Sequence, residues 1–329
     1  MGVKGWNFIP WRWVELDEII QGPIAIDVPN YLTRRLTVFR SQRIQNGRIP
    51  LQHVSVILSI IKSALAHKIT PLFLFDGPPE SLKRKPNPSL LIEAQNLYKE
   101  FRKTNDAFDD SISERLYNSP AIRMYFVMEH TKDIASYCGI PVIRSPSEAE
   151  LFGALLCKQK LATTVVSNDV DALLFGSHHV TKQLQFSKEM IHRTTISDLK
   201  DVLNLNLSQL RDLAILCGCD FYPSGLKGIG PRKGAALLNR HGNLSNVLDS
   251  QGIYGVEKED MIRAREVFDE ASYLSIHGVN TSLRPPLVSK LENILHPVLG
   301  SDRANTWAYE MVSLWKRFRV KQATLDKWI

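Results

Sequence analysis

The chain of 329 residues has few cysteines and no long apolar run, and each shortage excludes a class of protein. Its four cysteines lack paired C-x2-C spacing and lie in apolar surroundings, so we expect buried free thiols rather than disulfides or a zinc site. The most apolar stretch, 54–66, is shorter than the roughly 18–20 residues of a membrane span, so no membrane partner is expected. The N-terminus lacks the apolar core of a signal peptide, and we expect an intracellular protein.

Positive charge is what the chain has in excess. It carries 41 Lys and Arg against 34 Asp and Glu, a net charge of +7 at neutral pH. The resulting pI of about 9.2 meets the rough threshold for nucleic-acid-binding domains. A hydrophobic content of 44% suffices for a sizeable core, and the length suggests about two domains or one large α/β domain. Composition thus excludes a disordered or fibrous chain and is compatible with a nucleic-acid partner.

Short apolar runs without alternation predict buried central strands of a parallel sheet. Three of them end in aspartate and a fourth leads into a helix; they are 23–27, 71–76, 163–169 and 140–143. In the helix after the fourth run, Ser147 is a good N-cap, and Glu148 and Glu150 lie in the first turn. Helical patterns at 54–66 and 151–160 separate the runs. This alternation predicts an α/β fold with an open, mostly parallel sheet flanked by helices, whose functional groups gather at the carboxyl ends of the strands.

Two further segments depart from this alternation. Residues 77–125 open with Gly-Pro-Pro, carry a basic run and continue with a helix-like pattern, which predicts an insertion. From Ser208 onward the chain is helical, with one glycine-rich turn at 228–234. Glycines there would let the backbone approach phosphates closely, and Arg232 and Lys233 add charge. A packing turn between two helices is the alternative interpretation.

Seven carboxylates are expected at one edge of the sheet: Asp27, Asp76, Glu148, Glu150, Asp169, Asp171 and Asp220. A single aspartate at a strand end is often only a cap or turn former, but seven together could not all stay ionised without compensation. Carboxylate oxygens select hard ions such as Mg²⁺ or Mn²⁺, and two such ions activate water and stabilise the leaving oxygen of a phosphodiester. The i, i+2 spacing of two pairs requires them to lie near element ends. The cluster predicts metal-dependent phosphoryl chemistry.

The motifs around these acids match a known family in order and spacing. They are Phe75-Asp76-Gly77, residues 146–150, residues 168–171 with 174–176, and residues 218–220 with 228–233. By these motifs the chain resembles the flap endonuclease family of structure-specific 5′ nucleases, over essentially its whole length. The resemblance implies a 5′-nuclease-like (PIN-like) fold, two Mg²⁺ ions that Mn²⁺ can replace, and Asp27 and Asp171 among the catalytic groups.

The resemblance also assigns roles in the insertion. Lys83 falls where the family has a lysine at the base of a helical arch, which stabilises the developing charge on the phosphate. A solvated basic loop is the alternative for Lys83. The family's arch arginine has no counterpart, because residues 86–88 (Pro-Asn-Pro) interrupt a helix and Leu90 occupies its position. Arg84 or Arg102 could substitute for it.

Other family positions concern the grip on DNA. The stacking tyrosine is displaced, since Thr33 holds its position and Tyr31, which could instead be a core residue, lies two residues earlier. Gly2 and Lys4 resemble a family N-terminus that lies near the active site. Residues 208–250 resemble a helix-two-turn-helix element that holds duplex DNA, often with K⁺. Its expected backbone contacts are Lys227, Gly228, Gly230, Arg232 and Lys233.

The tail at 321–329 follows a nuclease domain at 1–320. Gln322, Leu325, Trp328 and Ile329 match the pattern of a peptide that binds the sliding clamp PCNA, and an amphipathic end that packs back on its own domain is the alternative. A clamp motif at the end of the chain looks archaeal; such a protein would be cytoplasmic, and a eukaryotic one nuclear. We expect a monomer.

The sequence therefore predicts a Mg²⁺-dependent endonuclease that cuts 5′ flaps at junctions of single-stranded and double-stranded DNA, in replication and repair. Specificity would come from the shape of the DNA, because nothing suggests readout of bases. A 5′-to-3′ exonuclease or a Holliday-junction resolvase of the same superfamily is the nearest alternative. A non-catalytic protein that binds DNA and the clamp is an alternative of another class, and a small-molecule phosphatase is a third.

Overall fold

The computed structural model describes residues 3–37, 52–77, 87–103, 110–270, 276 and 278–325. The chain divides into two compact units, each assembled from three separate segments. Unit 1 comprises residues 1–27, 76–84 and 144–279, and unit 2 comprises residues 28–75, 85–143 and 280–329. The predicted division into a nuclease domain at 1–320 and a tail at 321–329 stays a prediction.

Seven strands of the described chain form one sheet in the order β1-β7-β6-β5-β2-β3-β4. They are β1 (Arg12–Glu15), β2 (Ile24–Asp27), β3 (Pro71–Phe75), β4 (Val142–Arg144), β5 (Val165–Val166), β6 (His179–Gln185) and β7 (Met190–Thr195). Within unit 1, β5 lies between β2 and β6 and is parallel to both. The edge is antiparallel, because β6 and β7 form a hairpin on which β1 pairs. An open, mostly parallel sheet flanked by helices is confirmed.

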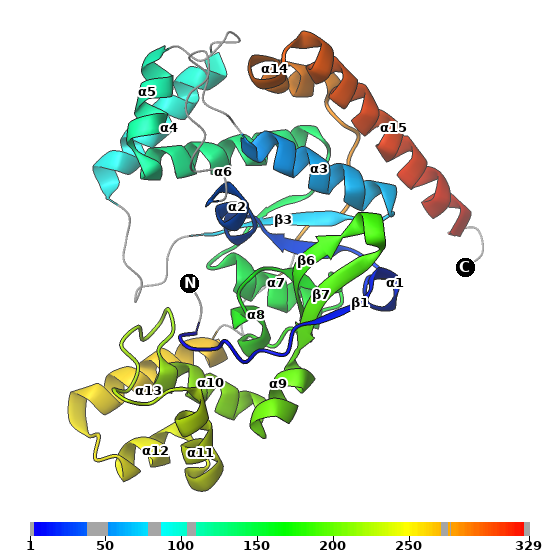
Figure 1. The fold of residues 1–329 in the computed structure, drawn as a ribbon. Helices are drawn as coiled ribbons and strands as arrows, with labels where there is room; N and C mark the ends of the chain where they lie inside the picture. Colours follow the sequence, from blue (N-terminus) through cyan, green and yellow to red (C-terminus); the bar gives the residue numbers. More distant parts are fainter. Residues whose placement is uncertain are drawn as a thin grey trace. The chain divides into compact units, whose positions relative to one another are not determined.

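Unit 1 contains the helices on either side of the acidic motifs and a helical cluster beyond them (Figure 1). These helices are α1 (Leu16–Ile19), α7 (Ala149–Lys158), α8 (Asp171–Leu174), α9 (Ile196–Leu203), α10 (Leu207–Cys217), α11 (Pro231–His241), α12 (Leu244–Ser250) and α13 (Gly255–Glu270). A 3₁₀ turn, Phe186–Lys188, joins β6 to β7. Asp212 of α10 accepts hydrogen bonds from Arg265 Nε of α13 (2.6 Å) and from the amide of Leu244 (3.0 Å). This buried carboxylate joins three helices of the cluster.

Unit 2 is mostly helical around β3. Its helices are α2 (Val28–Thr37), α3 (Gln52–Ala66), α4 (Pro88–Lys103), α5 (Asp110–Asn118), α6 (Pro120–Tyr137), α14 (Val288–Leu299) and α15 (Ser301–Leu325). Helix α6 packs against α3, α4, α5 and α14, and α14 pairs with α15 at the C-terminal end of the chain (Figure 1). Helix α4 begins at Pro88, as the prolines of the predicted insertion require.

Several side-chain predictions have clear outcomes. All four cysteines are free and buried. Tyr31 is a core residue, 6% exposed, and the Arg35 guanidinium lies 3.4 Å from its ring centroid. Thr33, at the family's tyrosine position, donates its hydroxyl to the carbonyl of Pro29. None of the helices in the described ranges is long and apolar enough to cross a membrane.

Candidate metal and nucleic-acid site

The sheet of unit 1 brings the first acid to the end of a buried strand. Asp27 is the last residue of β2 and is 2% exposed. Ala25 and Ile26 pair in register with β5, so the residue that follows β5, Ser167, lies level with Asp27. The Ser167 hydroxyl donates to Asp27 Oδ2 at 3.1 Å and accepts from the amide of Asp169 at 3.1 Å. This serine links two of the predicted acids.

The second group surrounds the start of α7. Glu148 is the N-cap residue of this helix and Glu150 lies in its first turn, so both carboxylates stand at the positive end of the helix dipole. The predicted N-cap, Ser147, is wrong by one position. The cap hydrogen bond comes from Asp76, whose Oδ1 accepts from the amide of Ala149 at 2.9 Å. Asp76 therefore fixes the helix that carries the two glutamates.

Gly77 allows this approach of Asp76. Its amide donates to the carbonyl of Ser147 at 2.6 Å. A Cβ atom at this position would meet the carbonyl oxygen of Ser145 at 2.1 Å, closer than real Cβ atoms come to any neighbour. Any larger residue would thus push Asp76 away from α7.

The third group lies at the start of α8. Asp171 is the first residue of this short helix, and its amide donates to Asp169 Oδ1 at 3.4 Å. Glu148 with Glu150 and Asp169 with Asp171 therefore both lie at helix starts, where the predicted i, i+2 spacing lets both members face one site. Asp220 lies in the loop after α10, near enough to Asp171 to raise its pKa.

Burial and mutual repulsion raise the pKa of these carboxyl groups. Desolvation is the largest cause for Glu150, whose pKa lies well above its usual range. Charges of four neighbouring acids add to the shift: Asp27, Asp169, Asp171 and Glu148. The pKa of Asp171 is also well raised, first by burial and then by the charges of Asp169 and Asp220. Six of the seven predicted acids are therefore linked by electrostatic interactions with Glu150 or Asp171.

The environment of Asp171 indicates which kind of ligand this cluster of acids can bind. Its side chain is 5% exposed, and its Oδ1 atom is buried without a hydrogen-bond donor among the described residues. Such an oxygen is costly unless a cation or a proton neutralises it. Hard divalent ions prefer carboxylate oxygens, so the donor set fits Mg²⁺ or Mn²⁺.

The arrangement of these carboxylates leaves their role as metal ligands untested. Within the described ranges, no three His, Cys, Asp or Glu side chains form a ready metal cage. The assignment of the seven acids as metal ligands therefore stays a prediction that the electrostatics of the site supports.

Lys4 anchors the N-terminal segment next to the loop that carries Asp220. Its amide donates to the carbonyl of Gly218 at 2.9 Å, and its Nζ donates to the carbonyl of Pro223 at 2.5 Å. The side chain thus has a structural role in addition to any contact with a substrate.

The glycine-rich turn between α10 and α11 presents charge and backbone amides together. Gly228 has φ of +77°, a conformation that only glycine adopts without strain, and Gly230 is the N-cap of α11. Ile229 between them is buried, which pins the turn, whereas Lys227, Arg232 and Lys233 are exposed. Amides at a helix N-terminus with adjacent cations favour an anion such as a DNA phosphate.

Several predicted residues lie outside the part of the chain that the structure describes. They are Gly2, Lys83, Arg84, Trp328 and Ile329. Gln322 and Leu325 belong to the backbone of α15. Arg102, a possible substitute for the arch arginine, contacts Asp133 and the hydroxyl of Tyr137 in unit 2.

Sequence reasoning missed two serines that organise the acids. Ser167 joins Asp27 to the 169–171 turn, and Ser145 donates its hydroxyl to the carbonyl of Glu148 at 2.8 Å and accepts from the amide of Ser147. Both are 2% exposed. The available signal was a serine two or three residues before each acidic pair, which is typical of a side-chain-stabilised turn.

Two family models match the chain. The XPG N-terminal domain matches residues 1–88, and the XPG I-region matches residues 139–220. These ranges contain all seven acids, with Asp27 and Asp76 in the first and the other five in the second.

Similar proteins extend the match over the whole chain. Flap endonuclease 1 of Methanocaldococcus jannaschii is 30% identical over 344 residues, covering 100% of this chain and 99% of its own. Flap endonuclease 1 of Encephalitozoon cuniculi is 33% identical over 236 residues, with 70% and 68% covered. Among solved structures, flap endonuclease-1 from Methanococcus jannaschii superposes with a TM-score of 0.70 at 27% identity, covering 95% of this chain and 98% of that one. The catalytic core of Rad2 in complex with DNA substrate gives 0.65 at 20% identity, with 94% and 100% covered, which is a likeness of fold.

Proposed function

The chain belongs to the flap endonuclease family, and from this premise we propose that it is a structure-specific nuclease that hydrolyses DNA at the base of 5′ flaps with divalent cations as cofactors. Similarity to flap endonucleases over the full length supports the activity. The observation that carries the metal dependence is the buried, mutually repelling set of carboxylates in unit 1. Buried carboxylates that repel one another lower the stability of the fold, and a bound cation offsets this cost.

The proposed ligands for two ions are the seven acids: Asp27, Asp76, Glu148, Glu150, Asp169, Asp171 and Asp220. Bound Mg²⁺ would lower the pKa of a water molecule and neutralise charge on the attacked phosphate. The chain's own residues position this site. Ser167 and Ser145 hold the turns, Asp76 fixes the start of α7, and the buried strands β2 and β5 carry Asp27 and the 169–171 turn at their ends.

The glycine-rich turn of α10 and α11 is the proposed grip on duplex DNA. Lys227, Arg232 and Lys233 are exposed cations around it, and K⁺ at the turn is part of this proposal. Phosphate contacts of this kind carry no sequence information and weaken with salt. We expect Lys233→Ala to weaken binding uniformly across DNA sequences and to reduce the slope of log affinity against log salt by about one.

The tail supplies a proposed partner. Helix α15 runs to Leu325, so Gln322 and Leu325 lie one helical turn apart on its last part. A helical turn that carries this motif suits the groove of a sliding clamp. Removal of residues 322–329 should abolish clamp binding and leave cleavage of a flap by the free enzyme unchanged.

The decisive experiment is cleavage of 5′-labelled DNA with Mg²⁺. Single-flap, nicked, gapped and four-way-junction substrates of matched sequence are compared, with EDTA as the metal-free reference. We expect incision at the base of the flap, which EDTA abolishes. Symmetric cleavage of four-way junctions with intact flaps would replace this activity with junction resolution, and binding without cleavage of any substrate would contradict the enzymatic function.

A further inference from the structure

Three phenylalanine rings from distant parts of the chain form one buried cluster in unit 1. Phe175 follows the last residue of α8, Phe221 lies in the loop after α10, and Phe268 lies in the last turn of α13. The ring centroid of Phe268 lies 5.2 Å from that of Phe175 and 5.3 Å from that of Phe221, and the latter two are 6.2 Å apart. None of the three residues is more than 5% exposed, so the rings hold one another in place.

The phenylalanine cluster adjoins two of the proposed metal ligands. Phe221 directly follows Asp220, and Phe175 comes one helical turn after Asp171, whose carbonyl accepts from the amide of Phe175 at 3.0 Å. The segments that carry these two acids lie far apart in the sequence, and Phe268 packs against both of them at once. The separation of the two acids therefore depends on the size and position of this one ring.

Helix α8 depends on contacts of this kind for its orientation. It has only four residues, Asp171–Leu174. A helix this short gains too few hydrogen bonds of its own to offset the cost of ordering its backbone. All four of its residues are buried, so packing against the rest of unit 1 rather than local propensity holds it. The direction in which α8 points its first residue, Asp171, is thus set by tertiary contacts.

Arg211 of α10 provides a second support for the same end of α8. Its Nε donates to the carbonyl of Leu174 at 2.7 Å, and its Nη1 donates to Asp269 Oδ1 at 2.7 Å. Asp269 follows Phe268 on α13 and also accepts from Arg265 Nη1 at 2.8 Å. The Arg211 side chain is 12% exposed, so its guanidinium is largely shielded from water. Adjacent residues of α13 thus hold the end of α8 twice, by packing through Phe268 and by hydrogen bonds through Arg211.

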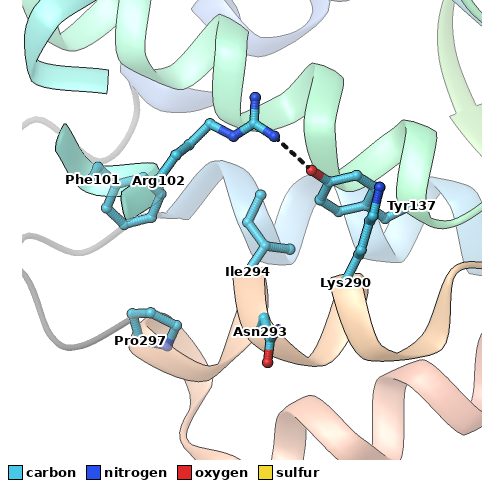
Figure 2. Close-up of a pocket in the computed structure, with 7 residues that line it drawn as sticks. All are labelled: Phe101, Arg102, Tyr137, Lys290, Asn293, Ile294 and Pro297. Atoms are coloured by element: carbon cyan, nitrogen blue, oxygen red, sulfur yellow. Dashed lines mark hydrogen bonds between the residues drawn. The ribbon is translucent and has the colours of Figure 1, made fainter. Parts of the chain in front are cut away.

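A guanidinium contact in unit 2 has the same form but involves no proposed metal ligand. Arg102 of α4 donates through Nη2 to the hydroxyl of Tyr137 in α6 at 3.0 Å, beside a pocket of about 190 Å³ (Figure 2). Neither α4 nor α6 carries any of the seven acids. Tyr137→Phe is therefore a matched control, because it removes a hydrogen bond from a guanidinium without changing a segment that carries a proposed ligand.

We propose that Phe268 and Arg211 are positioning residues for the metal site. Phe268 sets the separation of Asp171 from Asp220, and Arg211 fixes the helix that begins with Asp171. This role rests on the proposed function, since the separation of the two acids matters only where they bind the same ions. Neither positioning residue touches the ions or the substrate, and each acts through the acids. Ligands that must be held within about 0.5 Å of a productive geometry need such support from packed neighbours.

The test is a titration of the full chain with Mn²⁺, followed by electron paramagnetic resonance, together with urea denaturation of the same proteins in EDTA. Phe268→Leu keeps the position apolar but removes the ring that spans the two segments. We expect it to weaken Mn²⁺ binding about tenfold, the lower end of the range for residues that support metal ligands. The Mg²⁺ concentration that gives half-maximal flap cleavage should rise by the same factor.

Met261→Ala is the matched control for Phe268→Leu. Met261 is fully buried and lies two turns before Phe268 on the same face of α13. Because the shorter side chain leaves a cavity, we expect this control to lose at least as much stability towards urea as Phe268→Leu does. Its affinity for Mn²⁺ should nevertheless stay at the wild-type value, which separates positioning of the acids from general support of the fold.

Arg211→Met tests the second support. Methionine fills part of the same space and forms neither hydrogen bond, so the carbonyl of Leu174 loses its donor. We expect the affinity for Mn²⁺ to fall about fivefold. At a Mg²⁺ concentration below saturation, kcat should fall while KM for flap DNA stays unchanged. The control Tyr137→Phe should leave all three quantities at the wild-type values.

Unchanged Mn²⁺ affinity in both Phe268→Leu and Arg211→Met would overturn the proposal, and so would an equal loss of affinity in Met261→Ala. Flap cleavage by the wild type separates these results from a failure of the proposed function. Cleavage by a wild type whose variants bind Mn²⁺ equally well contradicts the positioning role alone. A wild type that binds Mn²⁺ but cleaves no DNA contradicts the nuclease activity, and the variants still decide the positioning role. A wild type that binds no Mn²⁺ contradicts both.

Discussion

The two units bury ionisable groups in opposite ways. In the core of unit 2, His53 Nε2 and His130 Nδ1 lie 2.8 Å apart and share one hydrogen bond. Burial lowers the pKa of both rings, that of His130 to about 4, so both are neutral at physiological pH. In unit 1, burial instead raises the pKa of Glu150 and Asp171, and the neighbouring acids raise it further.

This difference distinguishes the histidines of unit 2, which stabilise the fold, from the carboxyl groups of unit 1, to which we assign a chemical role. The two histidines share one hydrogen bond, and the aromatic rings of Phe101 and Phe126 pack against His130. The carboxylates of unit 1 raise one another's pKa, and in the proposed function a cation from outside neutralises them. Polar groups whose local arrangement costs stability are expected at functional sites, where the cost is offset on binding.

The largest effect should come from removal of one charge in unit 1. We expect Asp171→Asn to lower kcat for flap cleavage about 10³-fold, because an ion that stabilises the transition state by several kcal/mol loses a ligand. Steady-state cleavage of a labelled flap measures this. The matched control is Asp201→Asn on the exposed side of α9, which should cleave like the wild type. A variant at Asp171 that retains full activity would remove this acid from the site.

Removal of one histidine of the buried pair should instead lower stability and leave activity unchanged. His130→Ala leaves a cavity in the core of unit 2 and His53 without its partner, so we expect the free energy of unfolding to fall by about 3 kcal/mol. Urea denaturation measures the loss. His178→Ala, an exposed histidine of unit 1, is the control and should be neutral. Cleavage per folded molecule should stay unchanged in His130→Ala, and a large loss there would mean that the pair also serves catalysis.

Metal should stabilise one region only. At 100 times its dissociation constant, Mg²⁺ should add about 2.7 kcal/mol to the stability of the wild type, because it binds the folded acids. Thermal melts with Mg²⁺ and with EDTA give this difference. We expect Mg²⁺ to raise the stability of His130→Ala as much as that of the wild type, and that of Asp171→Asn far less. Equal gains in all three proteins would place the stabilising ion elsewhere.

The two units should have opposite pH slopes that partly cancel, so the net change in stability should be the smallest effect, although each unit of pKa shift corresponds to about 1.4 kcal/mol. The raised carboxyl pKa values mean that the folded, metal-free chain binds more protons than the unfolded one, so stability rises as pH falls through those values. The lowered histidine pKa values have the reverse sign, so stability falls as pH drops from about 6.5 to about 4. Melting temperatures in EDTA from pH 8 to 4 should pass through a maximum.

Variants assign the two slopes. Asp171→Asn should flatten the rise on the alkaline side, and His130→Ala should flatten the fall on the acid side. If either variant altered the slope assigned to the other unit, the carboxyl groups of unit 1 and the histidines of unit 2 would not titrate independently, which would contradict this assignment.

The buried strands and the acidic motifs could be predicted from the sequence, whereas the antiparallel edge of the sheet could not. The runs that became β2, β3 and β5 are continuously apolar, because both of their faces are covered. Strands β1, β6 and β7 escaped notice because half-exposed antiparallel strands mix polar and apolar residues without a continuous run. Order and spacing of the motifs sufficed for the family, which the comparisons confirm.

Tertiary partners account for what the sequence missed in the site. Ser147 has the side chain of an N-cap, yet Asp76, 73 residues away from Ala149, makes the cap hydrogen bond. Ser167 gains its role only because β2 and β5 pair in a register that sets it beside Asp27. Local propensity does not encode such long-range pairings.

Binding of Mn²⁺ to the full chain tests the central claim most directly. Electron paramagnetic resonance counts bound ions, and a pH indicator in weak buffer follows the protons released. We predict about two ions for each wild-type chain, release of protons from the carboxyl groups of raised pKa, and loss of both signals in Asp171→Asn. Mn²⁺ that stays free in solution, or that binds equally well to the variant, would contradict a metal site built from these acids.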